Sequence, residues 1–122
     1  MIEFEEYKGK LNGLKPTLDA LRDALHLEAA EKEIEELEGQ SARDGFWNDV
    51  ENSQRVQKRL KQLKAKVENY EKLCSGWDDL MTLCEMAIEE DDDSMLPELQ
   101  SEYAEFEKKL EETRLGTLLT GE

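Results

Sequence analysis

The chain has 122 residues, 39% of them charged, and its 31 acidic and 16 basic side chains give a formal net charge of −15. This length favours one domain with a modest core, and the charge disfavours direct binding to nucleic acid because an acidic surface repels phosphates. No segment is apolar enough to span a bilayer and the N-terminus has no signal-peptide pattern, so we expect a cytoplasmic protein without a membrane partner.

Apolar residues recur every three or four positions along most of the chain, which contains only two prolines. This spacing is typical of amphipathic helices, and the Val-, Ile- and Thr-rich runs that indicate strands are absent. We therefore predict an all-α fold, an antiparallel coiled-coil-like helical bundle with one long central helix. About four helices are expected in a single domain, 1–122, at about residues 3–25, 27–38, 49–89 and 95–115.

The first predicted helix carries an apolar series from Phe4 to Leu25 that Pro16 interrupts. A proline inside a helix removes one hydrogen bond and costs about 3 kcal/mol. We therefore expect a kink or a restart near Lys15.

The apolar phase changes at His26, and Gly39 is the expected C-cap of the short second helix. Glu28 and Lys32 have the spacing of a favourable helical ion pair, and the remaining glutamates of this helix are expected to face water. His26 is the only histidine, which favours a junction residue over a metal ligand.

Two large aromatics, Phe46 and Trp47, lie in the connection to the third helix, where Asn48 or Asp49 is a ready N-cap. Exposed, the two rings would form a binding patch; buried, they would plug the end of the bundle. Adjacent aromatics beside a cap resemble a hydrophobic staple, which favours the plug.

The third predicted helix would be about 55 Å long. A second group of leucines, Leu73, Leu80 and Leu83, widens its apolar stripe and predicts more than one neighbour for its second half. Gly76 either lets a neighbouring helix approach or bends the rod. The stripe itself comprises Ser53, Val56, Leu60, Leu63, Val67, Tyr70, Cys74, Trp77, Met81, Cys84 and Ile88.

Cys74 and Cys84 both fall on this stripe, about 15 Å apart on one helix, which is too far for a disulfide. They are interpreted as buried thiols of a reducing compartment. The basic residues between Arg55 and Lys66 are interpreted as a solvated helix face near acidic neighbours rather than a binding patch.

Five consecutive acidic residues, 89–93, precede the fourth predicted helix, which has Pro97 in its first turn and is expected to end near Gly116. The spacing of a calcium-binding loop is missing, so a turn that caps the fourth helix is favoured over a metal site. One histidine and two buried thiols form no nucleophile and base, and no glycine-rich phosphate loop is present. We predict no catalytic, cofactor-binding or metal-binding residue.

Four stretches carry a more specific pattern. They are residues 21–25 and 27–29 with 34–38, Phe46-Trp47-Asn48-Asp49 with Gln54, Ala87-Ile88-Glu89-Glu90-Asp91-Asp92, and Leu118-Leu119-Thr120-Gly121-Glu122. In these stretches the chain resembles the N-terminal helical domain of the bacterial peptide chain release factor 2 family, the class-I factors that act at UGA and UAA codons. The resemblance covers nearly the whole chain, although the family often has Pro-Asp before Phe-Trp where this chain has Asp44-Gly45.

The resemblance implies a role in translation termination, with the ribosome as partner. In the family this domain lies toward the large-subunit stalk base and the GTPase-associated centre, and is implicated in interplay with the class-II release-factor GTPase. The Ser-Pro-Phe and Gly-Gly-Gln motifs that read codons and promote hydrolysis do not occur in this chain, so it is not expected to be an enzyme.

Thr120-Gly121-Glu122 resembles the end of the family's domain, which favours a fragment of a longer factor. A freestanding coiled-coil adaptor or protein-interaction module is the alternative, and a metal-dependent enzyme built on residues 89–93 is the third hypothesis.

Overall fold

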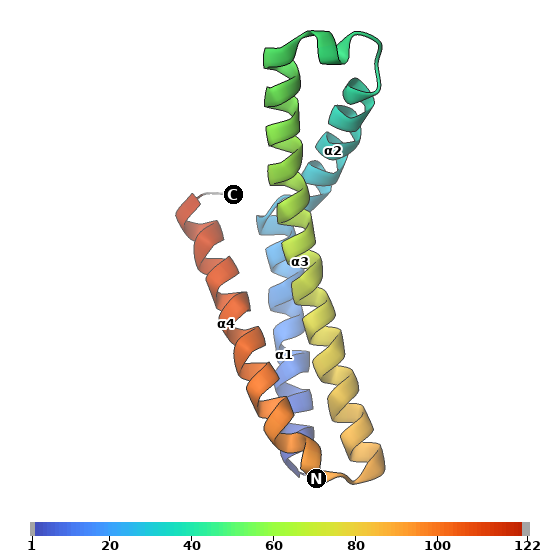
Figure 1. Ribbon diagram of the computed structural model, residues 1–122. Helices are drawn as coiled ribbons and strands as arrows, with labels where there is room; N and C mark the ends of the chain where they lie inside the picture. Colours follow the sequence, from blue (N-terminus) through green and yellow to red (C-terminus); the bar gives the residue numbers. More distant parts are fainter. Residues whose placement is uncertain (1, 121–122) are drawn as a thin grey trace.

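The structure, a computed structural model, describes residues 2–120 and is elongated (Figure 1). The described residues form four α-helices and two 3-10 turns, with no strand among them, so the predicted all-α fold is confirmed. The elements are α1 (Ile2–Ala24), α2 (Leu27–Ser41), η1 (Phe46–Asn48), α3 (Val50–Glu90), η2 (Asp93–Met95) and α4 (Leu96–Thr120).

The 41-residue helix α3 is the axis of the molecule, about 60 Å long at the usual helical rise. Helix α2 lies beside its N-terminal half, whereas α1 and α4 both lie beside its C-terminal half (Figure 1). This arrangement confirms the expectation that the second half of the long helix has more than one neighbour. It also makes one end of the molecule a three-helix bundle and the other a two-helix hairpin.

Two hydrophobic cores follow from this arrangement. The α2–α3 core consists of Ala30, Leu37, Phe46, Val56, Leu60 and Leu63. The three-helix core is larger, and its most deeply buried side chains include Phe4, Leu11, Leu18, Cys84 and Leu99. Val67 packs against both cores, so the apolar stripe of α3 is continuous from one to the other.

Helix α1 runs without a break through Pro16, so of the two expected alternatives the restart near Lys15 is wrong, and the kink stays a prediction. Side chains of α3 hold the helix on both sides of the proline: Trp77 Nε1 donates to the Leu11 carbonyl at 2.6 Å, and the Tyr70 hydroxyl donates to the Leu18 carbonyl at 2.9 Å. Packing of the continuous apolar face outweighs the single hydrogen bond that the proline removes.

The second helix does not end at Gly39 but continues to Ser41, with Ala42 as its C-cap. The Ser41 hydroxyl donates to the Leu37 carbonyl at 2.9 Å, and the Ala42 amide donates to the Gly39 carbonyl at 3.3 Å. These bonds satisfy carbonyls of the last turn without a left-handed glycine, so Gly39 stays inside the helix.

The fourth helix also passes its expected end, because α4 continues through Gly116 to Thr120. The Thr113 hydroxyl donates to the Lys109 carbonyl and the Thr117 hydroxyl to the Thr113 carbonyl, each at 2.9 Å, so side chains join successive turns on both sides of the glycine. Of the Thr-Gly-Glu ending noted above, Gly121 and Glu122 lie outside the described residues.

His26 occupies the junction between α1 and α2, as expected, and has a left-handed conformation with φ of 55°. The Lys66 ammonium of α3 donates to the adjacent Leu25 carbonyl at 2.7 Å. This contact places a positive charge at the C-terminal end of α1, where the helix dipole favours it, and anchors the junction to α3.

Candidate functional site

In the range 2–120 no group of three or more His, Cys, Asp or Glu side chains is arranged to hold a metal ion. Among the same residues, no helix combines the length and the apolar character needed to cross a membrane. Both cysteines are free thiols, and burial raises the pKa of Cys84, which favours the unreactive protonated form.

The acidic run between α3 and α4 serves local capping. Asp91 ends α3 in a left-handed conformation, φ 52°, and its amide donates to carbonyls of the last turn. The Asp92 carboxylate accepts from the Ser94 hydroxyl at 2.6 Å and the Ser94 amide at 2.9 Å, which lowers the pKa of Asp92. Asp92 thus caps the η2 turn, which directly precedes α4. The acidic run was expected to cap α4 itself.

The basic residues of α3 pair with glutamates of α2. Arg59 forms a bidentate contact with the Glu33 carboxylate at 2.7 and 3.0 Å, which lowers the pKa of Glu33, and Lys64 pairs with Glu38 at 2.9 Å. Glu33 and Glu38 therefore face water as expected, with side chains 38% and 52% exposed, but they also pair with cations of α3. Arg59 and Lys64 thus lie on a solvated face near acidic neighbours, as expected, and help to hold the hairpin together, although exposed pairs of this kind contribute little each.

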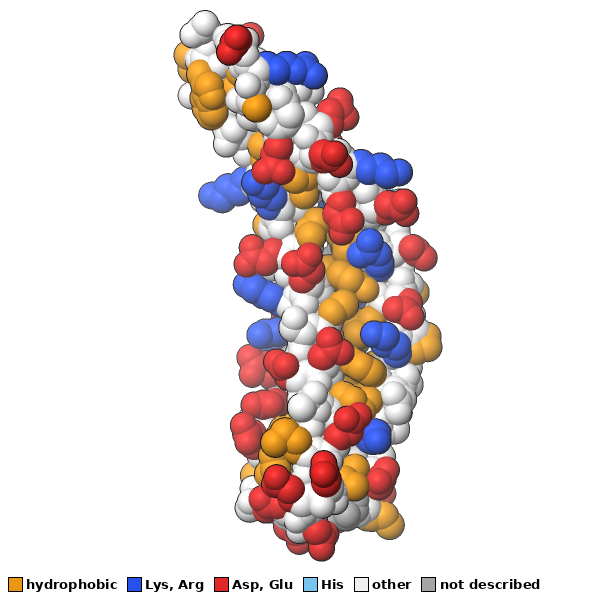
Figure 2. Space-filling view, turned by 90° about the vertical axis from the view of Figure 1, so that its right-hand side faces the viewer, with side chains coloured by type: hydrophobic (Ala, Val, Ile, Leu, Met, Phe, Trp, Pro, Cys, Tyr) orange, Lys and Arg blue, Asp and Glu red, His pale blue; other side chains and the backbone are white. Residues whose placement is uncertain are grey.

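The first candidate interaction surface is the hairpin tip, residues 42–50, where hydrophobic side chains gather at the upper end of the molecule in Figure 2. Gly45 has φ of 83°, a conformation that favours glycine, and turns the chain into η1. The N-cap of α3 is Asp49, whose carboxylate accepts from the Asn52 amide at 3.1 Å. The predicted cap is therefore confirmed.

The two aromatics of the tip have different environments. Phe46 is 8% exposed and belongs to the α2–α3 core, whereas Trp47 is 62% exposed and Val50 is 61% exposed. The rings meet edge to face, with centroids 4.9 Å apart and planes at 87°. The plug interpretation is confirmed for Phe46 and wrong for Trp47, whose ring is held in place by Phe46 but faces solvent.

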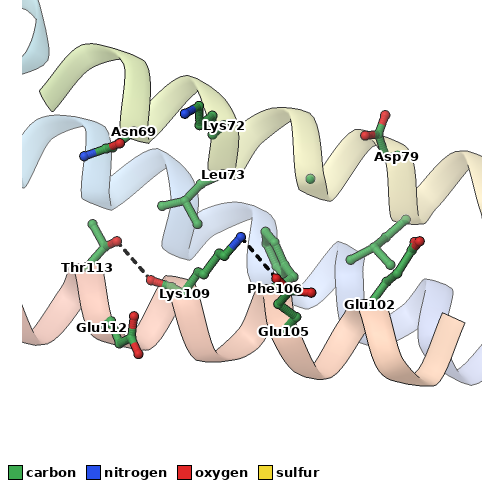
Figure 3. Close-up of a pocket in the computed structure, with 12 residues that line it drawn as sticks. Asn69, Lys72, Leu73, Asp79, Glu102, Glu105, Phe106, Lys109, Glu112 and Thr113 are labelled. Carbon is green, nitrogen blue, oxygen red and sulfur yellow. Dashed lines mark hydrogen bonds and ion pairs between the residues drawn. The ribbon is translucent and has the colours of Figure 1, made fainter. Parts of the chain in front are cut away.

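The second candidate surface is the α3–α4 groove, an open hollow of about 600 Å³ between the two antiparallel helices (Figure 3). Gly76 and Phe106 set the helix separation: a Cβ atom added at Gly76 would lie 3.3 Å from Cδ1 of Phe106. Gly76 therefore permits the close approach that was one of its two expected roles. The groove is lined by Asn69, Lys72, Leu73, Gly76, Asp79 and Leu80 of α3 and by Glu102, Glu105, Phe106, Lys109, Glu112 and Thr113 of α4.

Carboxylates dominate the edges of the α3–α4 groove. Lys109 pairs with Glu105 at 3.3 Å, the contact drawn in Figure 3, and Lys72 pairs with Glu68 at 3.2 Å. The remaining charged lining residues are Asp79, Glu102 and Glu112, and none of the ion pairs formed among the described residues includes them.

The pKa of Glu102 is affected by the negative charges along the groove. Partial desolvation raises the pKa of its carboxyl group, and the neighbouring carboxylates of Glu98, Asp79 and Glu105 raise it further. Its side chain extends from α4 toward α3 (Figure 3). The sequence did not reveal this acidic rim, the carboxylates along the edges of the α3–α4 groove. The spacing of Glu98, Glu102, Glu105 and Glu112 nevertheless places all four on one side of a helix.

Comparison with known proteins identifies the family. Residues 30–122 match the PCRF domain. The chain is 38% identical over 112 residues to peptide chain release factor 2 of Acidothermus cellulolyticus, covering 92% of this chain and 30% of that protein. It is 33% identical over 122 residues to peptide chain release factor 2 of Clostridium perfringens strain SM101, covering 100% of this chain and 33% of that protein.

Peptide chain release factor 2 of Streptomyces avermitilis is 37% identical over 113 residues, covering 93% of this chain and 31% of that protein. The chain thus spans about a third of the length of these relatives. The matched range contains α3, α4, the hairpin tip and the α3–α4 groove. The chain belongs to the PCRF domain family.

Proposed function

We propose that this chain is the helical domain of a release factor 2 and acts in translation termination at UGA and UAA codons. The observation that carries the proposal is the similarity to proteins named peptide chain release factor 2 over 92% to 100% of the chain. The domain's task is to dock and orient a factor. Reading of the codon and hydrolysis of peptidyl-tRNA belong to other parts of such a factor, since the 122 residues contain neither a Gly-Gly nor a Ser-Pro pair.

The partners in this proposal are the ribosome, at the large-subunit stalk base and GTPase-associated centre, and the class-II release-factor GTPase. The rod shape supports a positioning role, because α3 holds the hairpin tip away from the three-helix end by most of its length of about 60 Å (Figure 1). The net charge of −15 supports docking through protein rather than through RNA backbone.

A purified termination system tests the division of labour. Ribosomes carrying formyl-methionyl-tRNA next to UGA or UAA are mixed with this chain alone, with a complete release factor 2, or with both. The proposal expects no release from the chain alone and normal release from the complete factor. Stop-codon-dependent release by the chain alone would contradict it, because the hydrolytic chemistry would then lie in these residues.

A freestanding adaptor is the second candidate, favoured by three exposed leucines near the end of α4: Leu115, Leu118 and Leu119 are 50%, 77% and 86% exposed. An adaptor that associates through this surface would form dimers or larger species at micromolar concentration. Sedimentation equilibrium separates the candidates. A mass that rises with concentration, and falls back to the monomer in Leu118→Ser, supports the adaptor, whereas a constant monomer mass removes it.

A further inference from the structure

The α3–α4 groove has the dimensions of a helix-binding surface. Its α3 edge extends from Asn69 to Leu80 and its α4 edge from Glu102 to Thr113, so each edge covers three turns, or about 16 Å. Both edges belong to continuous helices, and the hollow between them is open to solvent. A helical segment of about three turns can therefore lie along it without a rearrangement of the backbone.

The floor of the groove offers little apolar surface. Leu73, Leu80 and Phe106 are 5%, 2% and 5% exposed because they already pack within the three-helix core. Burial of new apolar area therefore contributes only modestly to a complex. The hollow of about 600 Å³ above the floor is better suited to the long aliphatic stems of lysine or arginine side chains, which cover an apolar surface while their charged ends reach its polar edges.

The charges along the edges of the groove favour a positively charged ligand. Asp79, Glu102 and Glu112 contribute three carboxylates without a cation in ion-pair range among residues 2–120, whereas the two lining lysines are already paired. Desolvation raises the pKa of Glu102, and repulsion from the carboxylates of Glu98, Asp79 and Glu105 raises it further. A cation placed between the edges would relieve that repulsion, and an anionic ligand such as a nucleic acid would increase it.

We infer that the α3–α4 groove is a docking site for a lysine- or arginine-rich helix of a partner protein. The partner helix lies along the groove for about three turns, with its basic side chains directed at Asp79, Glu102 and Glu112. Charge complementarity supplies most of the selectivity, so binding should be weak to moderate and should decrease as salt is added. This inference does not depend on the role in termination, since it follows from the groove alone.

Titration calorimetry with two synthetic peptides tests the inference. Both peptides have three to four turns and the same number of lysines and alanines; one has its lysines on a single helix face, and the other has them spread around the helix. The full 122-residue chain is titrated with each at physiological and at high salt. We expect the one-faced peptide to bind with a dissociation constant on the order of 10–100 µM at physiological salt, and the other peptide several-fold more weakly.

Two double variants separate the groove from the general negative charge. Glu102→Gln with Glu112→Gln removes two rim carboxylates, and Glu35→Gln with Glu36→Gln removes two exposed carboxylates of α2, so both proteins lose the same two negative charges. The rim variant should weaken binding of the one-faced peptide about fivefold, and the α2 variant less than about twofold. All four positions are exposed on helices, where glutamine is a good helix former, so both variants should fold.

Nuclear magnetic resonance then locates the bound peptide through the changes in the protein's amide chemical shifts when peptide is added. Changes confined to residues 69–80 and 102–113 support the inference. Equal weakening in the two double variants, or equal binding of the two peptides, would overturn it, because the attraction would then depend only on net charge. Shifts centred on the hairpin tip would also overturn it, since the peptide would then bind around Trp47.

Discussion

Replacing Phe46 by alanine should destabilise the α2–α3 end of the molecule far more than replacing its neighbour Trp47. Phe46 is 8% exposed and is one of six residues in the α2–α3 core, so its loss removes the ring that closes that core at the hairpin tip. Core phenylalanine-to-alanine changes cost about 3–5 kcal/mol. Because the site lies at the end of a small core that can partly collapse, the lower figure of about 3 kcal/mol applies.

Trp47→Ala is the matched control. Its side chain is 62% exposed, and its main contact is the edge-to-face pair with Phe46, with ring centroids 4.9 Å apart. A pair of this kind contributes about 0.5–1.5 kcal/mol, so the loss of stability should be at most about 1 kcal/mol.

Urea denaturation followed by far-ultraviolet circular dichroism measures both variants, and the fluorescence of Trp77 in Trp47→Ala reports the three-helix core separately. We expect Phe46→Ala to lower the unfolding free energy by about 2 kcal/mol more than Trp47→Ala. Equal losses, or a larger loss for Trp47→Ala, would refute the assignment of Phe46 as the buried plug and of Trp47 as the exposed ring.

Three further changes test other contacts. Leu63→Asp buries a carboxylate at a position that is 2% exposed, so it should cost several kcal/mol and unfold the α2–α3 end, visible as lost helical dichroism. Asp49→Ala removes the cap on the Asn52 amide and should cost about 1 kcal/mol in urea denaturation. Glu102→Gln should raise the melting temperature at neutral pH. Because the pKa of Glu102 is raised in the folded state, the protein loses stability as the pH rises from the ordinary pKa of 4.5 through the raised pKa of the folded protein. Glutamine does not ionise, so it avoids this loss. Below pH 4.5 the gain should disappear; a gain that persists at low pH would show that it does not come from charge.

The helices and their packing partners could be predicted because they depend on periodicity. The three-to-four spacing from Ser53 to Ile88 identified the long central helix, and the additional leucines after Leu73 indicated its second neighbour. Local side-chain hydrogen bonds extend two helices beyond their expected ends. Gly39 and Gly116 are weak helix formers by propensity, yet side-chain hydrogen bonds and neighbouring turns keep both inside helices.

The candidate surfaces were less predictable because exposure at an end of a bundle depends on geometry rather than on residue type. Phe46 and Trp47 are adjacent aromatics, and only the path of the chain through Gly45 decides which ring enters the core. The α3–α4 groove requires the register between two helices, which the closeness of Gly76 and Phe106 sets and which neither helix carries in its own periodicity. Its carboxylates resembled an ordinary solvated helix face.

The most direct test of the account is a chimaera in which this chain replaces the matching third of the Clostridium perfringens release factor 2, to which it is similar over 100% of its length. Peptide release on UGA and UAA ribosomes is compared with that of the parent factor and of a factor lacking the matching third. If the chain is a release-factor docking domain, the chimaera should keep kcat/KM within about tenfold of the parent and well above the truncated factor. A chimaera that folds, shown by its helical dichroism, but releases no faster than the truncated factor would contradict the account.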